Sequence, residues 1–201
     1  GTLITNTATL SYSIGGTPET PIVSAPASLQ VAEIINLTLA WQDGAPVSVA
    51  SPDINDALTF LLTNTGNGTE RFTLTRNNLL AGDNYDPLNG SAGAIFLENG
   101  LAPGLQTSGP TADTLYAAGV NDPDLPADVS RTVYVVSNTP AGLVSGNTGL
   151  ATLAAAATTP GAAGAAPGTT LAGLGTSGVD AVVGASQAQA SRTGSYLVSN
   201  V

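Results

Sequence analysis

The chain has 201 residues, a formal net charge of −10 and no Cys, and charged residues make up only 9% of it, against roughly 25% in ordinary soluble domains. It has four Arg and neither Lys nor His. Such a chain repels phosphate backbones and anionic lipid, which argues against nucleic-acid binding, membrane-surface binding and membrane insertion. The absence of Cys excludes a small domain held together by disulfides.

The compartment is the next inference from composition. No Met is present, even at position 1, which predicts a processed mature chain whose export signal has been removed. The most apolar long stretch, residues 151–175, is interrupted by Pro160 and Pro167 and is too weak for a membrane span. A low-charge surface rich in Thr, Ser, Asn, Ala and Gly suits a secreted, extracellular or cell-surface assembly. Without Lys, no Lys–Asn cross-link can form, so such an assembly would be non-covalent.

The first long pattern is Leu3 to Ile14, written LITNTATLSYSI. Apolar and polar residues alternate with a period of two, which predicts a half-buried strand. The residues on its apolar side are Ile4, Ala8, Leu10, Tyr12 and Ile14. Gly15-Gly16 and then the Pro-containing residues 17–21 follow as a joint. We therefore expect residues 1–20 to be an N-terminal strand and joint, and residues 21–201 to be the main domain.

The first half of that domain has strong strand patterns. Ser28 to Trp41 predicts a second long strand, in which Glu33 alone interrupts the apolar face, and Trp41 is expected in the core or at its edge. A short strand follows at Pro46 to Ala50. Asp56 to Thr63 and Glu70 to Thr75 flank an Asn- and Gly-rich loop, which predicts a β-hairpin.

The second half is richer in Gly, Pro and Ala. Further strands are expected at residues 94–97, 114–118, 129–137, 150–157, 179–183 and 196–201. The strand at 129–137 is apolar on both sides and should be central. Residues 150–157 fit either strand or helix, and we favour strand because Thr and Gly flank them. Residues 158–170 read as a linker or long loop, and residues 186–190 leave room for one helical turn. Short strands separated by Gly, Pro and Asn turns predict an all-β fold, a β-sandwich.

The segments LQVAEIINLTLAW, PVSVASPD and ALTFLLTNTGNGTERFTL, together with ITNTATLSYS near the N-terminus, carry a family resemblance. They resemble a repeat domain of unknown function that is widespread in bacterial and archaeal surface proteins, and the Gly/Ala-rich remainder is similar to uncharacterised secreted proteins of Gram-negative bacteria. The resemblance implies an immunoglobulin-like β-sandwich at the cell surface and no enzyme activity. Such relatives often carry a calcium-like loop, but residues 97–113 lack its regular acidic spacing, which argues against a family-type metal site.

Catalytic motifs find little support. Without His, Lys or Cys, the usual activated Ser or Thr nucleophiles cannot be built, and nothing marks a pair among the 14 acids for glycoside hydrolysis. Gly173 to Gly178 matches G-x-G-x-x-G, but a strand pattern follows it where a dinucleotide site needs a helix, and the position about twenty residues on is Val198. We interpret this segment as a glycine-rich turn and expect no enzyme activity and no catalytic residues.

Calcium is the one cofactor that the sequence leaves open. Acidic and amide side chains cluster at residues 53–56, 83–86 and 121–128, and such loops can supply the oxygens that Ca²⁺ requires. None has the spacing of a known calcium loop, and Asp and Asn also serve turns through side-chain hydrogen bonds. The strongest of these weak metal-site candidates are Asp122, Asp124 and Asp128.

The leading functional hypothesis comes from the N-terminal stretch. Leu3 to Ile14 could complete a neighbouring copy by β-strand addition (donor-strand complementation), with Ile4, Ala8, Leu10, Tyr12 and Ile14 as the plug. The protein would then be the subunit of a pilus-like extracellular filament, a homopolymer whose partners are copies of itself. Two alternatives stay open: the stretch is the first strand of its own domain, with Gly15-Gly16 as a tight hairpin, or the protein is an adhesin or binding module within a larger surface protein.

Overall fold

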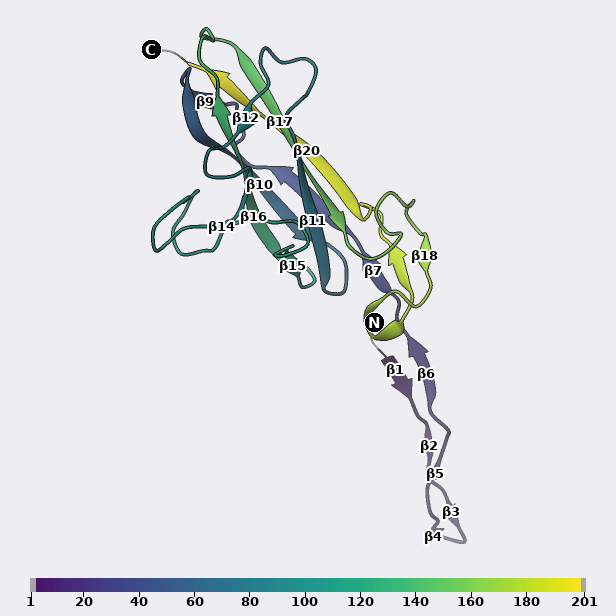
Figure 1. Ribbon diagram of the computed structural model, residues 1–201. Helices are drawn as coiled ribbons and strands as arrows, with labels where there is room; N and C mark the ends of the chain where they lie inside the picture. The colour runs from purple at the N-terminus through teal and green to yellow at the C-terminus, as the bar shows by residue number, and fades with distance from the viewer. Residues whose placement is uncertain (1–2, 200–201) are drawn as a thin grey trace.

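The computed structural model describes residues 3–199. It has two parts, a β-sandwich and a narrow two-stranded arm that projects from one end of it (Figure 1). Among the described residues, the helical structure is limited to a short 3-10 turn, η1 (Thr176–Gly178), and no helix is long and apolar enough to cross a bilayer. The predicted all-β sandwich is confirmed.

The first sheet of the sandwich has the strand order β14-β13-β16-β10-β8, with β12 also paired to β16. Its strands are β8 (Leu37–Trp41), β10 (Asp53–Asn64), β12 (Leu88–Asn89), β13 (Ile95–Leu97), β14 (Thr114–Leu115) and β16 (Ser130–Thr139). The central strand, β16, is buried on both faces over residues 133–137, as its doubly apolar sequence predicts.

The second sheet has the order β15-β11-β17-β20-β9. Its strands are β9 (Val47–Val49), β11 (Glu70–Asn77), β15 (Asp124–Leu125), β17 (Thr148–Ala157) and β20 (Gln189–Val198). The strand order is that of an immunoglobulin-like domain. The neighbours β8-β10-β16-β13 correspond to its ABED sheet, and β11-β17-β20 correspond to its CFG sheet. The sandwich therefore obtains its full set of strands from its own chain.

The core lies between these two sheets. Alternate residues of β10 and β16 point inward and meet those of β17 and β20, as half-buried strands require. The largest fully buried side chains of the core are Tyr196, Phe60, Phe72, Ile35, Leu37, Leu58, Leu62, Leu153, Val133, Val135 and Val183. Val136 is also fully buried, but in a second cluster with Phe96 and Tyr134. Trp41 is partly buried at the edge of this core, as expected, and its Nε1 donates a hydrogen bond to Asp43 Oδ2 at 2.6 Å.

The loop of residues 64–69 corrects one expectation. The strands on either side of it, β10 and β11, belong to different sheets, so the connection is an arch across the sandwich and the predicted hairpin is wrong. Asn64 is fully buried, and its Nδ2 donates to the carbonyls of Gly68 (2.8 Å) and Leu125 (2.7 Å). Its Oδ1 accepts the Gly66 N–H at 2.9 Å. The Asn and Gly residues thus form a turn, as predicted, but the buried amide directs the chain to the other sheet.

The last third of the chain follows most of the predictions. Residues 148–157 form strand β17, so the choice of strand over helix is confirmed. The helical turn expected at residues 186–190 is wrong, because β20 already begins at Gln189. A small third sheet, of order β18-β19-β7, joins this region to the start of the sandwich; its strands are β7 (Glu33–Ile35), β18 (Thr170–Leu171) and β19 (Ala181–Val183). The expected last strand ends at Val198, and residues 200–201 lie outside the described part.

Candidate functional site

The arm is an outgoing and a returning strand, each broken into short paired segments. Three antiparallel pairings hold it together. They join β1 (Leu3–Asn6) to β6 (Ala27–Gln30), β2 (Thr9–Leu10) to β5 (Ile22–Val23), and β3 (Ser13–Ile14) to β4 (Thr17–Pro18). At the tip, Gly15 and Gly16 have φ values of 58° and 84°, the two positive values that a tight type I′ hairpin turn needs.

This pairing corrects the leading expectation for Leu3 to Ile14. The stretch is not a single strand that awaits a neighbour, because residues of its own chain already pair with it. The expected long strand from Ser28 to Trp41 is likewise divided into β6, β7 and β8. The chain keeps its alternation across these breaks, but Leu29 in the arm is 65% exposed whereas Ile35 in the sandwich is 1% exposed. The apolar side of residues 28–41 is therefore exposed where the segment belongs to the arm and buried in a core where it enters the sandwich.

The register gathers most of the apolar side chains of the arm on one face, whereas Leu3 and Val23 lie on the other. Ile4 lies opposite Leu29, and Leu10 lies opposite Ile22. Between the paired segments, two residues of the outgoing strand face three of the returning strand, once near Pro21 and once near Pro26. These extra residues let the even-numbered residues of the outgoing strand stay on one face. We define the apolar face as Ile4, Ala8, Leu10, Tyr12, Ile14, Ile22 and Leu29.

The apolar face lacks any cover in this structure. Its six large side chains are between 40% and 66% exposed. Complete burial of such a side chain contributes about 1.5–3 kcal/mol, and a two-stranded hairpin without a packed face is marginally stable in water. An arm of this kind is therefore stabilised when a second surface covers it.

The predicted plug residues thus lie together, but on a hairpin. Sequence reasoning missed two members of the face, Ile22 and Leu29, which come from the returning strand. The signal that points to them is the Gly15-Gly16 turn flanked by two apolar stretches. This is the tight hairpin that the sequence left open as an alternative, and it is confirmed.

The root of the arm is held firmly to the sandwich. Glu33, which interrupts the apolar pattern, is only 4% exposed, and its carboxylate accepts hydrogen bonds from the backbone N–H and, at 3.3 Å, the Oγ1 of Thr176. Asn67 accepts the Ile34 N–H at 2.6 Å and donates to the Ala32 carbonyl at 3.1 Å. These hydrogen bonds, part-buried at Glu33 and exposed at Asn67, link the root of the arm to the 64–69 arch and to η1 and so help to fix the direction of the arm.

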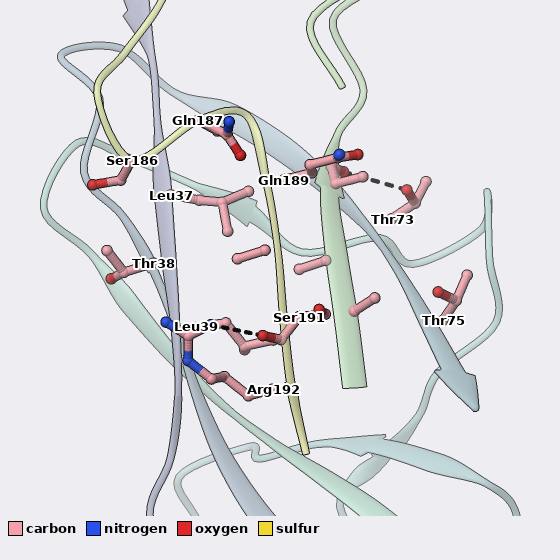
Figure 2. A pocket seen from close by; sticks show the side chains of 14 residues that line it. Leu37, Thr38, Leu39, Thr73, Thr75, Ser186, Gln187, Gln189, Ser191 and Arg192 are labelled. Carbon is pink, nitrogen blue, oxygen red and sulfur yellow. Dashed lines mark hydrogen bonds between the residues drawn. The ribbon is translucent and has the colours of Figure 1, made fainter. Parts of the chain in front are cut away.

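A groove of about 750 Å³ is lined by residues of β8, β11, β17 and β20 and of the loop before β20 (Figure 2). Its lining is mostly small and uncharged, and the buried Leu37 and Leu39 form part of it. The lining residues are Leu37, Thr38, Leu39, Thr73, Thr75, Ala154, Ala155, Ala156, Ser186, Gln187, Gln189, Ala190, Ser191 and Arg192. The single charged group among them is Arg192.

Arg192 differs from Arg71 and Arg76, whose guanidinium groups have acidic or polar side chains as partners. Arg71 lies 3.7 Å from Asp124. Arg76 is held by the Pro87 and Leu88 carbonyls (3.2 Å each), by Ser137 Oγ (3.0 Å) and by Asn89, and burial lowers the pKa of its guanidinium. Arg192 is exposed and donates to the carbonyl of its neighbour Ser191 at 2.8 Å. Within residues 3–199 the one ion pair is Arg71–Asp124, so Arg192 keeps its charge available for an acidic group.

The acidic loops act in turns. Asp122 Oδ1 accepts the Tyr116 hydroxyl at 2.7 Å and the Gly119 N–H at 3.1 Å, and burial, together with this carboxylate, raises the pKa of Tyr116 to about 12. Asp124 faces Arg71, and Asp128 is exposed with a φ of 61°. In the part of the chain that the structure describes, no three acidic, His or Cys side chains are grouped as a metal site would need. Asp122, Asp124 and Asp128, the calcium ligands that the sequence left open, do not form a preformed site in the described residues.

The other two acidic clusters also bind backbone. Asp83 accepts the Leu150 N–H at 2.9 Å, and Asp53 accepts the N–H of Ala50 and of Ile54 at 3.0 and 2.9 Å. Asp56 is different, because its Oδ2 is buried and has no hydrogen-bond partner within the described residues. Burial, and then the charge of Asp53, raise the pKa of Asp56 to about 6.

Comparisons with known proteins give limited guidance. No family model matches the chain, and no curated protein matches it, so the resemblance to surface-protein repeats rests on the residues quoted above. Among solved structures, the chain is similar to the SafD adhesin of Salmonella, with a TM-score of 0.35 and 16% sequence identity over 82% of this chain and 99% of that chain. A likeness at this level carries no functional argument.

Proposed function

We propose that this protein is a structural subunit of an extracellular or cell-surface assembly, in which copies associate non-covalently through the arm. The observation that supports this most directly is the apolar face, which is exposed along the whole arm although it has the composition of a core. Exposed apolar patches of this kind mark interaction surfaces. The low charge of the chain, 9% of residues, suits close packing between copies.

The proposal treats the arm as a unit that is separate from the sandwich. Its boundary is best placed after Gln30, because β6 pairs with β1 alone, whereas Glu33 is already buried in the body. The sandwich has its own complete set of strands, so a neighbour's arm would add to a finished domain from outside.

We propose that β-strand addition takes place along one edge of the arm. The returning strand contains Pro18, Pro21 and Pro26, which have no N–H to donate to a new strand. The outgoing strand, residues 3–14, has neither Pro nor a charged residue. Each of its paired segments belongs to a two-stranded sheet, so its other edge has no strand beside it among the described residues. A strand from a neighbouring copy would therefore pair along residues 3–14.

Analytical ultracentrifugation and negative-stain microscopy of the purified chain test the proposal. We expect association that increases with concentration, and a Leu10→Ser/Ile22→Ser variant should raise the dissociation constant at least about tenfold, because each buried apolar side chain contributes about 1.5–3 kcal/mol. Thr9→Ser, on the opposite face, is the matched control and should associate like the wild type. Both variants should keep the wild-type melting temperature, because these residues do not belong to the sandwich core.

A chain that stays monomeric at all concentrations would contradict the proposal. That result would favour the alternative, a binding module within a larger surface protein.

A further inference from the structure

We infer that the apolar face of the arm docks in the groove of a second copy of the chain, with Glu19 of the arm facing Arg192 of the groove. This inference rests on the proposed function and specifies where on the neighbour the arm binds. Three observations carry it: the charges of the two surfaces, their shapes, and the direction of the arm.

The charges of the two surfaces are complementary. Glu19 is the single charged residue in residues 3–30, and Arg192 is the single charged residue of the groove lining. The Glu19 N–H donates to the Tyr12 carbonyl at 3.0 Å. This bond places Glu19 opposite Tyr12, on the side of the apolar face. An acid set within an apolar surface is costly to bury without a cation, and the groove provides one.

The alternative of two arms packing face to face lacks that cation. An arm has no basic residue, so such a pair would bury Glu19 from both copies without a positive partner. If the arm lay on a surface without an Arg, Glu19 would likewise have no cation opposite it. The groove offers an exposed Arg at a concave surface.

The shapes also correspond. The groove presents Thr, Ala and Ser on the strands beneath it, so it has room for large side chains, and its volume of about 750 Å³ is within the usual range of binding pockets. The end of the arm carries Leu10, Tyr12, Ile14 and Ile22, all at least 40% exposed. Small side chains on one surface and large ones on the other are what close packing between them requires.

The direction of the arm makes the contact intermolecular. In Figure 1 the arm continues the line of β7 away from the sandwich, and its tip is the part of the chain farthest from the body. Twelve extended residues span about 40 Å, so the tip lies well beyond its own groove and can reach that of a neighbour. Because the arm and groove are different surfaces, each copy can donate one and accept another, which builds an open chain of subunits.

Charge reversal tests the pairing. Glu19→Arg alone and Arg192→Glu alone should each raise the dissociation constant about tenfold or more, because each places like charges together at the contact. An equimolar mixture of the two variants should recover near-wild-type association, since each arm then meets a groove of opposite charge. Asp86→Arg makes the same change in net charge as Glu19→Arg at an exposed loop residue outside the groove, and it should associate like the wild type or slightly better.

The outcomes separate this inference from the proposed function. If both single variants associate like the wild type while Leu10→Ser/Ile22→Ser does not, the arm joins copies but binds elsewhere, and the groove assignment is wrong. Single variants that both weaken association without rescue on mixing would also overturn the Glu19–Arg192 pairing. If the wild type itself never associates, both proposals fail, and the arm is covered by something other than a second copy.

Discussion

We expect that replacing Asp56, an acid in strand β10 of the sandwich, stabilises the protein at neutral pH. Its Oδ2 is buried without a hydrogen-bond partner, and burial next to the charge of Asp53 raises its pKa from 3.8 to about 6. A pKa that is higher in the folded than in the unfolded state means that the folded state favours the protonated acid. The resulting stability is present below about pH 4 and is lost as the pH rises through about 6.

The size of the effect follows from the shift. Two pH units correspond to about 3 kcal/mol, which is an upper limit because Asp56 is still partly exposed to solvent. We therefore expect Asp56→Asn to raise the free energy of unfolding at pH 7 by about 1–2 kcal/mol, and the melting temperature by about 2–8 °C for a chain of this length. At pH 3.5 the two proteins should be nearly equally stable, because Asp56 is then mostly protonated in both states.

Urea unfolding at pH 3.5, 5 and 7 measures this difference directly. The comparison between the variant and the wild type isolates Asp56 from other acids, such as Glu98, whose pKa is lowered by the Tyr134 hydroxyl. Asp128→Asn is the matched control, because Asp128 is exposed and Asn accepts its φ of 61°. A variant that is less stable than the wild type at pH 7, or a gain in stability that does not depend on pH, would refute the reasoning.

Three further predictions concern single sites. Tyr196→Phe should lower the free energy of unfolding by about 1–3 kcal/mol in urea denaturation, because the buried hydroxyl lies 2.9 Å from Ser137 Oγ and has two backbone carbonyls, each at 3.2 Å, to which its one proton can be donated; an unchanged stability would show that these contacts contribute nothing. Gly66→Ala should cost about 1–3 kcal/mol, since the new Cβ would lie 2.1 Å from the Ile34 carbonyl oxygen, whereas a neutral result in the same assay would mean that the arch adapts freely. Calorimetric titration with calcium should give neither heat nor a higher melting temperature, because Asp122 is already engaged by Tyr116; saturable heat would overturn this expectation.

Much of the fold could be predicted because strand periodicity is a local property. The apolar residues on both sides of 129–137 predicted the central strand β16, and the Thr and Gly that flank 150–157 favoured strand over helix for β17. The turn residues of 64–69 were also identified, but the pairing of the flanking strands was not. Whether two strands share a sheet depends on contacts such as that of Asn64 with Leu125, 61 positions later in the chain, and no local pattern reports them.

The candidate site divides in the same way. Residues 3–14 are marked by their own alternation as a strand with an apolar side, and the lack of His, Lys and Cys is fixed by composition. Alternation does not say which segment pairs with that strand or whether anything covers it, because its register is set by the turn at Gly15-Gly16 and by the extra residues of the returning strand. Arg192 and the small residues of β11 and β17 form one groove only when separate strands come together, so the groove is a product of tertiary structure alone.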